Sequence, residues 1–132
     1  MKGKILFVDE SPVIKKIIKR AIEAADYMLL EASDGKEGLA VLSKEVQDVK
    51  LILTDWNMPV MNGFDFLKAV KSHAAYKHIP VIMITTEAEK GNINKAIQAG
   101  AANYILKPFN TEDLMKKALQ CINNKINKNK KG

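Results

Sequence analysis

Short apolar runs alternate five times along the chain with longer stretches in which apolar residues recur every three or four positions. The runs are rich in Val, Ile and Leu, and they cover residues 4–8, 27–31, 50–54, 81–85 and 103–106. Continuous rather than alternating hydrophobicity is typical of strands that are covered on both faces, as in a parallel sheet between two helix layers. We therefore expect five buried strands.

The intervening amphipathic stretches predict five helices, and several of them carry end signals. The first follows Ser11 and Pro12, a side-chain cap and the residue best suited to the first helical position. The second begins near Asp34, with Glu37 placed to complete a reciprocal cap. The others are expected over residues 63–73, over residues 88–99 with a stop at Gly100, and from about residue 110 onwards.

Five strand–helix units in this order predict one α/β domain with a doubly wound parallel sheet. Five units are too few for a closed barrel, so the flavodoxin-like strand order 2-1-3-4-5 is favoured. Strands one and three are then neighbours, and the topological switch point lies between them. We expect this domain to cover residues 1–124 and residues 125–132 to form a Lys-rich, disordered tail.

Composition and charge limit the kinds of partner and the compartment that we expect for this protein. The 132 residues carry a formal net charge of +6, with much of the excess in the tail and on the first helix. Neither group is interleaved with aromatic residues, so we expect no nucleic-acid partner. No apolar stretch approaches the roughly 20 residues needed to cross a bilayer, and we expect no membrane insertion. The single cysteine, Cys121, agrees with a reducing compartment, so we expect a cytoplasmic protein.

Charged side chains follow three of the predicted strands. Asp9 and Glu10 follow the first, Asp55 ends the third and is followed by turn residues, and Lys107 follows the fifth. The carboxyl ends of parallel strands share one rim of the sheet, so we expect these four side chains to converge. Like charges about 4 Å apart cost on the order of 4 kcal/mol per pair at an effective dielectric near 20. An acidic triad therefore needs a proton or a cation, and an all-oxygen ligand set favours Mg²⁺.

Two further groups at this rim suit a phosphoryl ligand. Thr85, at the end of the fourth strand, offers a hydroxyl donor, and Lys107 offers a compact positive charge. Pro108 fixes the turn behind the lysine, which a cis bond would allow. A carboxylate beside Mg²⁺, a hydroxyl and a lysine is an arrangement for attack on a phosphoryl donor. The predicted product is an acyl phosphate on Asp55.

Five motifs resemble the receiver domains of two-component response regulators, with the closest likeness to single-domain chemotaxis members, over roughly residues 3–124. They are Asp9-Glu10, the Thr-Asp-Trp-Asn-Met-Pro sequence around Asp55, Ile-Thr-Thr-Glu-Ala around Thr85, Gln-Ala-Gly-Ala around Gly100, and Tyr-Ile-Leu-Lys-Pro-Phe around Lys107. The resemblance implies that Asp55 is the phosphoacceptor, that Asp9, Glu10, Asp55 and the Asn57 carbonyl surround Mg²⁺, and that Thr85 and Lys107 bind phosphoryl oxygens. The acidic pair departs from the usual Asp-Asp, which leaves the geometry of Glu10 less certain than that of Asp9.

The resemblance also implies a switch and its partners. Thr85 moves toward the phosphoryl group and Tyr104 turns inward, which reshapes the face of the fourth helix, fifth strand and fifth helix. Asn57 and Glu87 stand at positions that tune the phosphate lifetime, in the combination of fast-cycling regulators. A histidine kinase supplies the phosphoryl group, and a separate output protein, such as a flagellar motor switch component, reads the changed face. We expect a monomer, and no enzyme beyond its own phosphorylation and autodephosphorylation.

Three alternatives stay open on the residues. A single-domain receiver can instead act as an intermediate in a phosphorelay. A Mg²⁺-dependent aspartate-nucleophile phosphohydrolase is a rival of another class. Such enzymes typically carry the nucleophilic Asp directly after the first strand, with an acid two residues later. Here Asp9 is followed by Glu10, Ser11 and Pro12, which does not fit. A flavodoxin-like cofactor binder is a further rival, but Asp9 and Glu10 would repel its phosphate.

Overall fold

One parallel sheet of five strands forms the centre of the molecule, in the order β2-β1-β3-β4-β5. The structure is a computed structural model that describes residues 1–131, except for the side chains of Glu87 and of residues 126–131. Its strands are β1 (Lys4–Val8), β2 (Met28–Ala32), β3 (Val49–Asp55), β4 (Val81–Thr86) and β5 (Asn103–Lys107). The strand order and the parallel pairing confirm the predicted doubly wound architecture.

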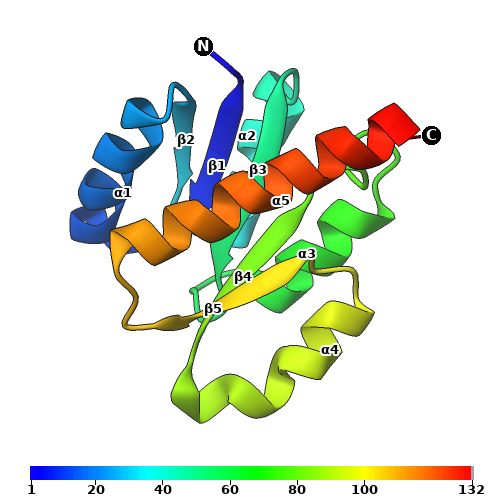
Figure 1. Cartoon of the computed structure of the whole chain (residues 1–132). Helices are drawn as coiled ribbons and strands as arrows, with labels where there is room; N and C mark the ends of the chain where they lie inside the picture. The colour runs from blue at the N-terminus through cyan, green and yellow to red at the C-terminus, as the bar shows by residue number, and fades with distance from the viewer. Residues whose placement is uncertain (132) are drawn as a thin grey trace.

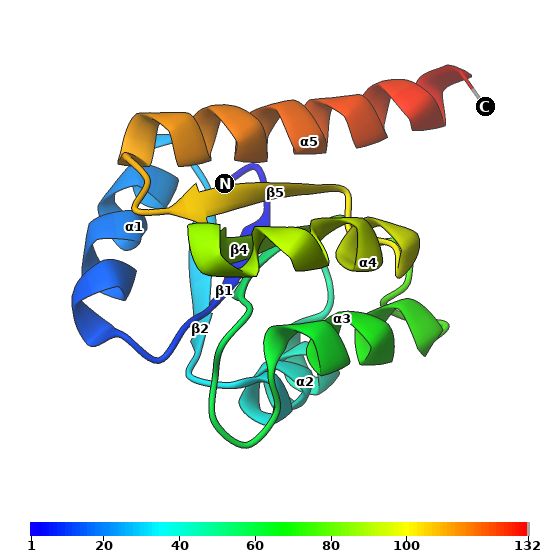
Figure 2. The ribbon, with the colours of Figure 1, turned by 90° about the horizontal axis from the view of Figure 1, so that it is seen from below.

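Helices cover both faces of the sheet, as the continuous apolar strands predict. The helical elements are α1 (Pro12–Ala24), α2 (Gly35–Glu45), α3 (Gly63–Ser72), η1 (Glu87–Asn92), α4 (Ile93–Gln98) and α5 (Thr111–Lys131). Helices α1 and α5 lie on one face, and α2, α3 and α4 lie on the other (Figures 1 and 2). None of the described helices is both long enough and apolar enough to span a membrane.

Alternate side chains of β1 enter two separate cores. Ile5 and Phe7 pack with the apolar faces of α1 and α5, whereas Leu6 and Val8 pack with those of α2 and α3. All four are fully buried. Successive strand residues point to opposite faces, so both faces of an interior strand must be apolar when helices cover each side. This burial fixes the register of β1 and therefore the position of its carboxyl end in the sheet.

The predicted helix starts are confirmed by their caps. The Ser11 hydroxyl accepts a hydrogen bond from the Ile14 N–H at 3.3 Å, and Pro12 is the first residue of α1. The Asp34 carboxylate accepts from the Glu37 N–H at 2.8 Å at the start of α2. Each bond satisfies a backbone donor that has no partner within its helix.

One predicted helix differs in the structure. The helix expected over residues 88–99 is divided into the 3₁₀ segment η1 and the short helix α4. Gly91 and Asn92, both poor helix formers, lie at the junction, and they explain why the α-helical hydrogen bonds begin only at Ile93. Helix α5 extends to Lys131, and the disordered tail expected over residues 125–132 stays a prediction.

Candidate functional site

A lysine ammonium group joins two buried carboxylates at the carboxyl ends of the central strands. Lys107 Nζ lies 3.2 Å from Asp9 Oδ2 and 3.0 Å from Asp55 Oδ2. Asp9 is 1% exposed and Asp55 is 8% exposed, so both acids are largely removed from water. The three residues come from positions far apart in the sequence, and the strand order brings them together as predicted.

Backbone contacts fix both carboxylates in place. Asp9 directly follows β1, its Oδ1 accepts from the Ser11 N–H at 2.8 Å, and its own N–H donates to the Ala32 carbonyl at 3.0 Å. Asp55 is the last residue of β3. A side chain on Gly63 would collide with the Asp55 carbonyl, so only glycine allows α3 to begin this close to the acid.

Burial and the charge of the ion-pair partner have opposite effects on the pKa values of Asp55 and Lys107. Burial raises the pKa of Asp55 and the charge of Asp9 raises it further, while the hydrogen bond and charge of Lys107 counteract them. Burial would lower the pKa of Lys107, but its hydrogen bonds to the two acids and their charges outweigh it, and its pKa is raised. The lysine is therefore held protonated, while the surroundings of Asp55 stabilise its charged form less well than water does.

The structure brings together two of the three predicted carboxylates. Glu10 is exposed to solvent and lies outside the pair formed by Asp9 and Asp55. Both residues lie beyond the end of β1, where the bonds of Asp9 to the Ser11 N–H and to Lys107 hold its side chain inward, while Glu10 faces solvent. In the described part of the chain, no three or more His, Cys, Asp and Glu side chains are grouped so that they could hold a metal ion. The expected acidic triad is thus a pair here.

The donor set at this rim still fits Mg²⁺. This ion takes one or two carboxylates and keeps several of its waters, so two acids on neighbouring strands are enough. Asn57, whose carbonyl was expected to be a ligand, lies in the loop directly after Asp55, and its side chain is exposed. Asp9, Asp55 and the Asn57 carbonyl are the residues that would hold the ion.

The Thr85 hydroxyl is buried without a hydrogen-bond partner. Thr85 is 2% exposed and lies near the end of β4. Among the buried side-chain nitrogen and oxygen atoms that the structure describes, its Oγ1 is the one without a hydrogen-bond partner. Thr85 pairs in register with Leu106 on β5, one residue before Lys107, so it lies on the strand next to the one that carries the lysine. An unsatisfied buried hydroxyl costs on the order of 1–3 kcal/mol, so the group is poised to bond to a ligand that arrives at the site.

Tyr104, the predicted switch residue, is half-buried and is contacted by a lysine of α5. Lys117 Nζ donates to the Tyr104 carbonyl at 2.8 Å and lies 5.1 Å from the centre of the Tyr104 ring. The tyrosine therefore lies at the boundary between β5 and α5, on the face that was expected to change. The Glu87 side chain, expected to tune the phosphate lifetime, lies outside the described residues.

The loop between β3 and α3 contains a strained turn. The Met61 N–H donates to the Pro59 carbonyl at 2.7 Å, which closes a three-residue turn around Val60. Val60 has a φ of 68°, in the left-handed region that β-branched residues avoid. Val60 is also 78% exposed, so burial does not compensate for this conformation.

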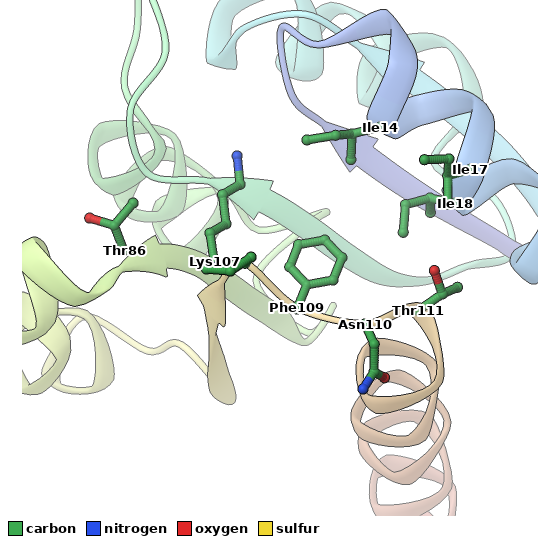
Figure 3. Close-up of a pocket in the computed structure, with 9 residues that line it drawn as sticks. Ile14, Ile17, Ile18, Thr86, Lys107, Phe109, Asn110 and Thr111 are labelled. Carbon is green, nitrogen blue, oxygen red and sulfur yellow. The ribbon is translucent and has the colours of Figure 1, made fainter.

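An apolar cleft of about 640 Å³ opens beside Lys107, a feature that the sequence analysis did not predict. It lies between α1 and the connection from β5 to α5, and Figure 3 shows Phe109 facing Ile14 and Ile18 across it. Ile17, which also lines it, is 52% exposed. A possible signal in the sequence was that α1 has more apolar residues than the core buries, since Val13 and Ile17 are 66% and 52% exposed.

Comparison with known proteins finds the same family along most of the chain. The family described as "Response regulator receiver domain" matches residues 5–119. The chemotaxis protein CheY1 of Helicobacter pylori is 43% identical over 120 residues, which are 90% of this chain and 95% of that protein. The chemotaxis protein CheY of Pseudomonas aeruginosa is 38% identical over 125 residues, 94% of this chain and 98% of that protein.

Solved structures agree with the sequence comparison. The chemotaxis response regulator CheY4 of Vibrio cholerae superposes with a TM-score of 0.83 at 36% identity, covering 92% of this chain and 99% of that one. A CheY-like receiver domain protein of Methanospirillum hungatei gives a TM-score of 0.85 at 30% identity, covering 97% and 99%. The likeness therefore extends over nearly the whole described fold.

Proposed function

The chain belongs to the family of response regulator receiver domains, and from this premise we propose that Asp55 accepts the phosphoryl group that drives its signalling cycle. It is a phosphorylation-dependent response regulator, and its similarity to the chemotaxis proteins CheY1 and CheY supports a role in chemotaxis. It is not an enzyme in the usual sense, because the reaction it promotes is its own phosphorylation and dephosphorylation. The main support for the proposal is the contact of the Lys107 ammonium group with both Asp9 and Asp55.

The transfer takes place at the Asp55 carboxylate. The P–N bond of a phosphohistidine breaks, its electron pair stays on the imidazole nitrogen, and an Asp55 oxygen forms the new P–O bond. Burial helps, because a carboxylate that is only partly stabilised by its surroundings is a better nucleophile than a fully hydrated one. Hydrolysis by water later returns Asp55 and releases inorganic phosphate.

Mg²⁺ bound by Asp9, Asp55 and the Asn57 carbonyl would neutralise the charge that gathers when a phosphate approaches two acids. Glu10 would contribute only by turning inward or through a water. Lys107 then exchanges one carboxylate partner for a phosphoryl oxygen, since its ammonium group already faces Asp55 at 3.0 Å. The lysine keeps the site near charge balance at both stages of the cycle.

Thr85 provides the response to phosphorylation. Its partnerless hydroxyl donates to a phosphoryl oxygen, which removes the cost of leaving it unsatisfied. Because β4 leads directly into η1 and α4, a shift of Thr85 moves the start of this segment. Tyr104 on the adjacent strand β5 follows, and the surface of α4, β5 and α5 changes. Asn57 and Glu87 are proposed to set how long the acyl phosphate survives.

The partners are two proteins. A histidine kinase is the phosphoryl donor, and we assign its histidine-bearing domain to the apolar cleft, because Lys107 lines both the cleft and the acidic pair. A separate protein, such as a flagellar motor switch component, reads the changed face. We expect this exchange to take place in the cytoplasm.

The test is to follow phosphorylation of the purified chain by acetyl phosphate. Mass spectrometry is expected to find one acid-stable, base-labile phosphoryl group in the presence of Mg²⁺, none with excess EDTA and none in Asp55→Asn. Trp56, next to the acceptor, reports metal and phosphoryl binding through its fluorescence. Phosphorylation that persists in Asp55→Asn, or that ignores EDTA, would overturn the proposal.

A further inference from the structure

Two aromatic rings lie directly beside the phosphoacceptor. Trp56 follows Asp55, and its N–H donates to the Ile84 carbonyl at 2.9 Å. Its indole stacks on the ring of Phe64, with ring centroids 5.4 Å apart and an interplanar angle of 15°. Phe64 lies in the first turn of α3, so the pair links the end of β3 to this helix.

Two lysines place their ammonium groups over the same Phe64 ring. Lys68 Nζ lies 4.7 Å from the ring centroid and comes from the next turn of α3 itself. Lys95 Nζ lies 4.6 Å from the centroid and comes from α4. Both distances are within the range of favourable cation–π contacts. Only the second contact joins two helices, and Figure 2 shows α3 and α4 running next to each other at this place.

Helix α4 is weakly held by its other contacts. It has six residues, and Ala96 is its one buried side chain. Neither α4 nor the preceding η1 has a side-chain hydrogen bond at its N-cap, and Ile97 is 45% exposed. With so little burial, a single favourable contact changes the position of the helix measurably.

We propose that Lys95 is a positioning residue, whose ammonium group on the Phe64 ring ties α4 to the aromatic pair beside Asp55. A change at Asp55 that displaces Trp56 is then passed through Phe64 to α4, in addition to the route along β4. The contact joins α4 to α3 and involves neither the two acids nor Lys107. This inference rests on the proposed function for the signal that it passes on.

The test measures amide hydrogen exchange of the full chain, peptide by peptide. Lys95→Met removes the charge but keeps most of the side chain, and we expect it to speed exchange of the amides of α4 about two- to fivefold. Lys68→Met is the matched control, because it removes a contact with the same ring from within α3 and should leave α4 unchanged. Lys95→Arg keeps a cation over the ring and should restore the wild-type rate.

A double-mutant cycle separates the ring contact from any other role of the lysine. In a Phe64→Leu background, Lys95→Met should change the exchange of α4 no further. The inference is overturned if Lys95→Met exchanges like Lys68→Met, if Lys95→Arg behaves like Lys95→Met, or if Lys95→Met has its full effect without the ring.

A second arm compares each chain with and without acetyl phosphate and Mg²⁺, with phosphoaspartate measured by mass spectrometry in the same samples. In the wild type, we expect the amides of α4 to exchange at different rates with and without phosphorylation, so that the ratio of these two rates differs from one. In Lys95→Met at equal phosphorylation, this ratio should lie closer to one. An unchanged ratio overturns the relay. A wild type that forms no phosphoaspartate overturns the proposed function instead, while the unphosphorylated samples still decide whether Lys95 holds α4.

Discussion

Replacing Lys107 by methionine would leave two buried acids facing each other without their shared cation. Both carboxylate oxygens lie within 3.2 Å of the lysine nitrogen, so they are close neighbours. Two unit charges at about 4 Å repel by roughly 4 kcal/mol at an effective dielectric near 20, and slightly less at a longer separation. Breaking a buried ion pair typically costs about 3–5 kcal/mol. We expect Lys107→Met to lower the free energy of unfolding by about 3 kcal/mol at neutral pH without Mg²⁺.

The pH dependence of this loss identifies its cause. Without the lysine, the pKa of Asp55 rises further above its ordinary value, because the contribution that counteracts burial is gone. A folded state with a raised acid pKa binds protons more tightly than the unfolded chain, so its stability increases as the pH falls. The deficit should therefore be largest at pH 7 and shrink toward pH 4. Added Mg²⁺ should reduce it at pH 7.

Urea unfolding followed by circular dichroism measures both effects. Lys68→Met is the control, since it removes the Lys68–Asp65 pair at 3.4 Å, 54% exposed on both sides, and the contact of Lys68 with the Phe64 ring, and together these should matter by no more than about 1 kcal/mol. Equal stability of Lys107→Met and the wild type at pH 7, or a deficit independent of pH, would refute the electrostatic reasoning.

Three further predictions concern the same rim. Asp55→Asn should be more stable than the wild type at pH 7 and lose this advantage as the pH falls, because burial raises the pKa of the acid and disfavours its charge; urea unfolding across pH checks the sign. Thr85→Val should raise the free energy of unfolding by about 1 kcal/mol while weakening the Trp56 fluorescence response to acetyl phosphate, and a stability loss would show that the hydroxyl has a partner. Val60→Gly should raise the melting temperature by about 3 °C and Val60→Ala should not, since glycine alone relieves the left-handed φ.

The fold could be predicted because the strongest sequence signals are local and agree with one another. Burial on both faces makes the strands continuous apolar runs, and Ser11 and Asp34 mark helix starts through bonds to backbone three residues on. The division of the fourth helix was missed, because its apolar spacing continues across Gly91 while the backbone does not. Periodicity records which face is buried and is insensitive to 3₁₀ geometry.

The site could be predicted in outline, because strand order alone brings Asp9, Asp55 and Lys107 to one rim. The outward direction of Glu10 was not foreseen, since side-chain direction at a strand end depends on where the strand stops. The contact of Lys95 with Phe64 also escaped the sequence analysis. It joins residues 31 positions apart on two surface helices, and neither residue type nor spacing indicates such a pair.

Strand β5 is the last in the sheet, and this has a consequence for redesign. It has hydrogen-bonded neighbours on one side only, whereas β1 and β3 are paired on both sides. Displacing an outer strand disrupts one ladder instead of two. Sequence changes in α5, and in β5 at positions other than Lys107, are therefore expected to redirect the protein to a different output partner, while the chemistry of Lys107 and the acid pair is left intact.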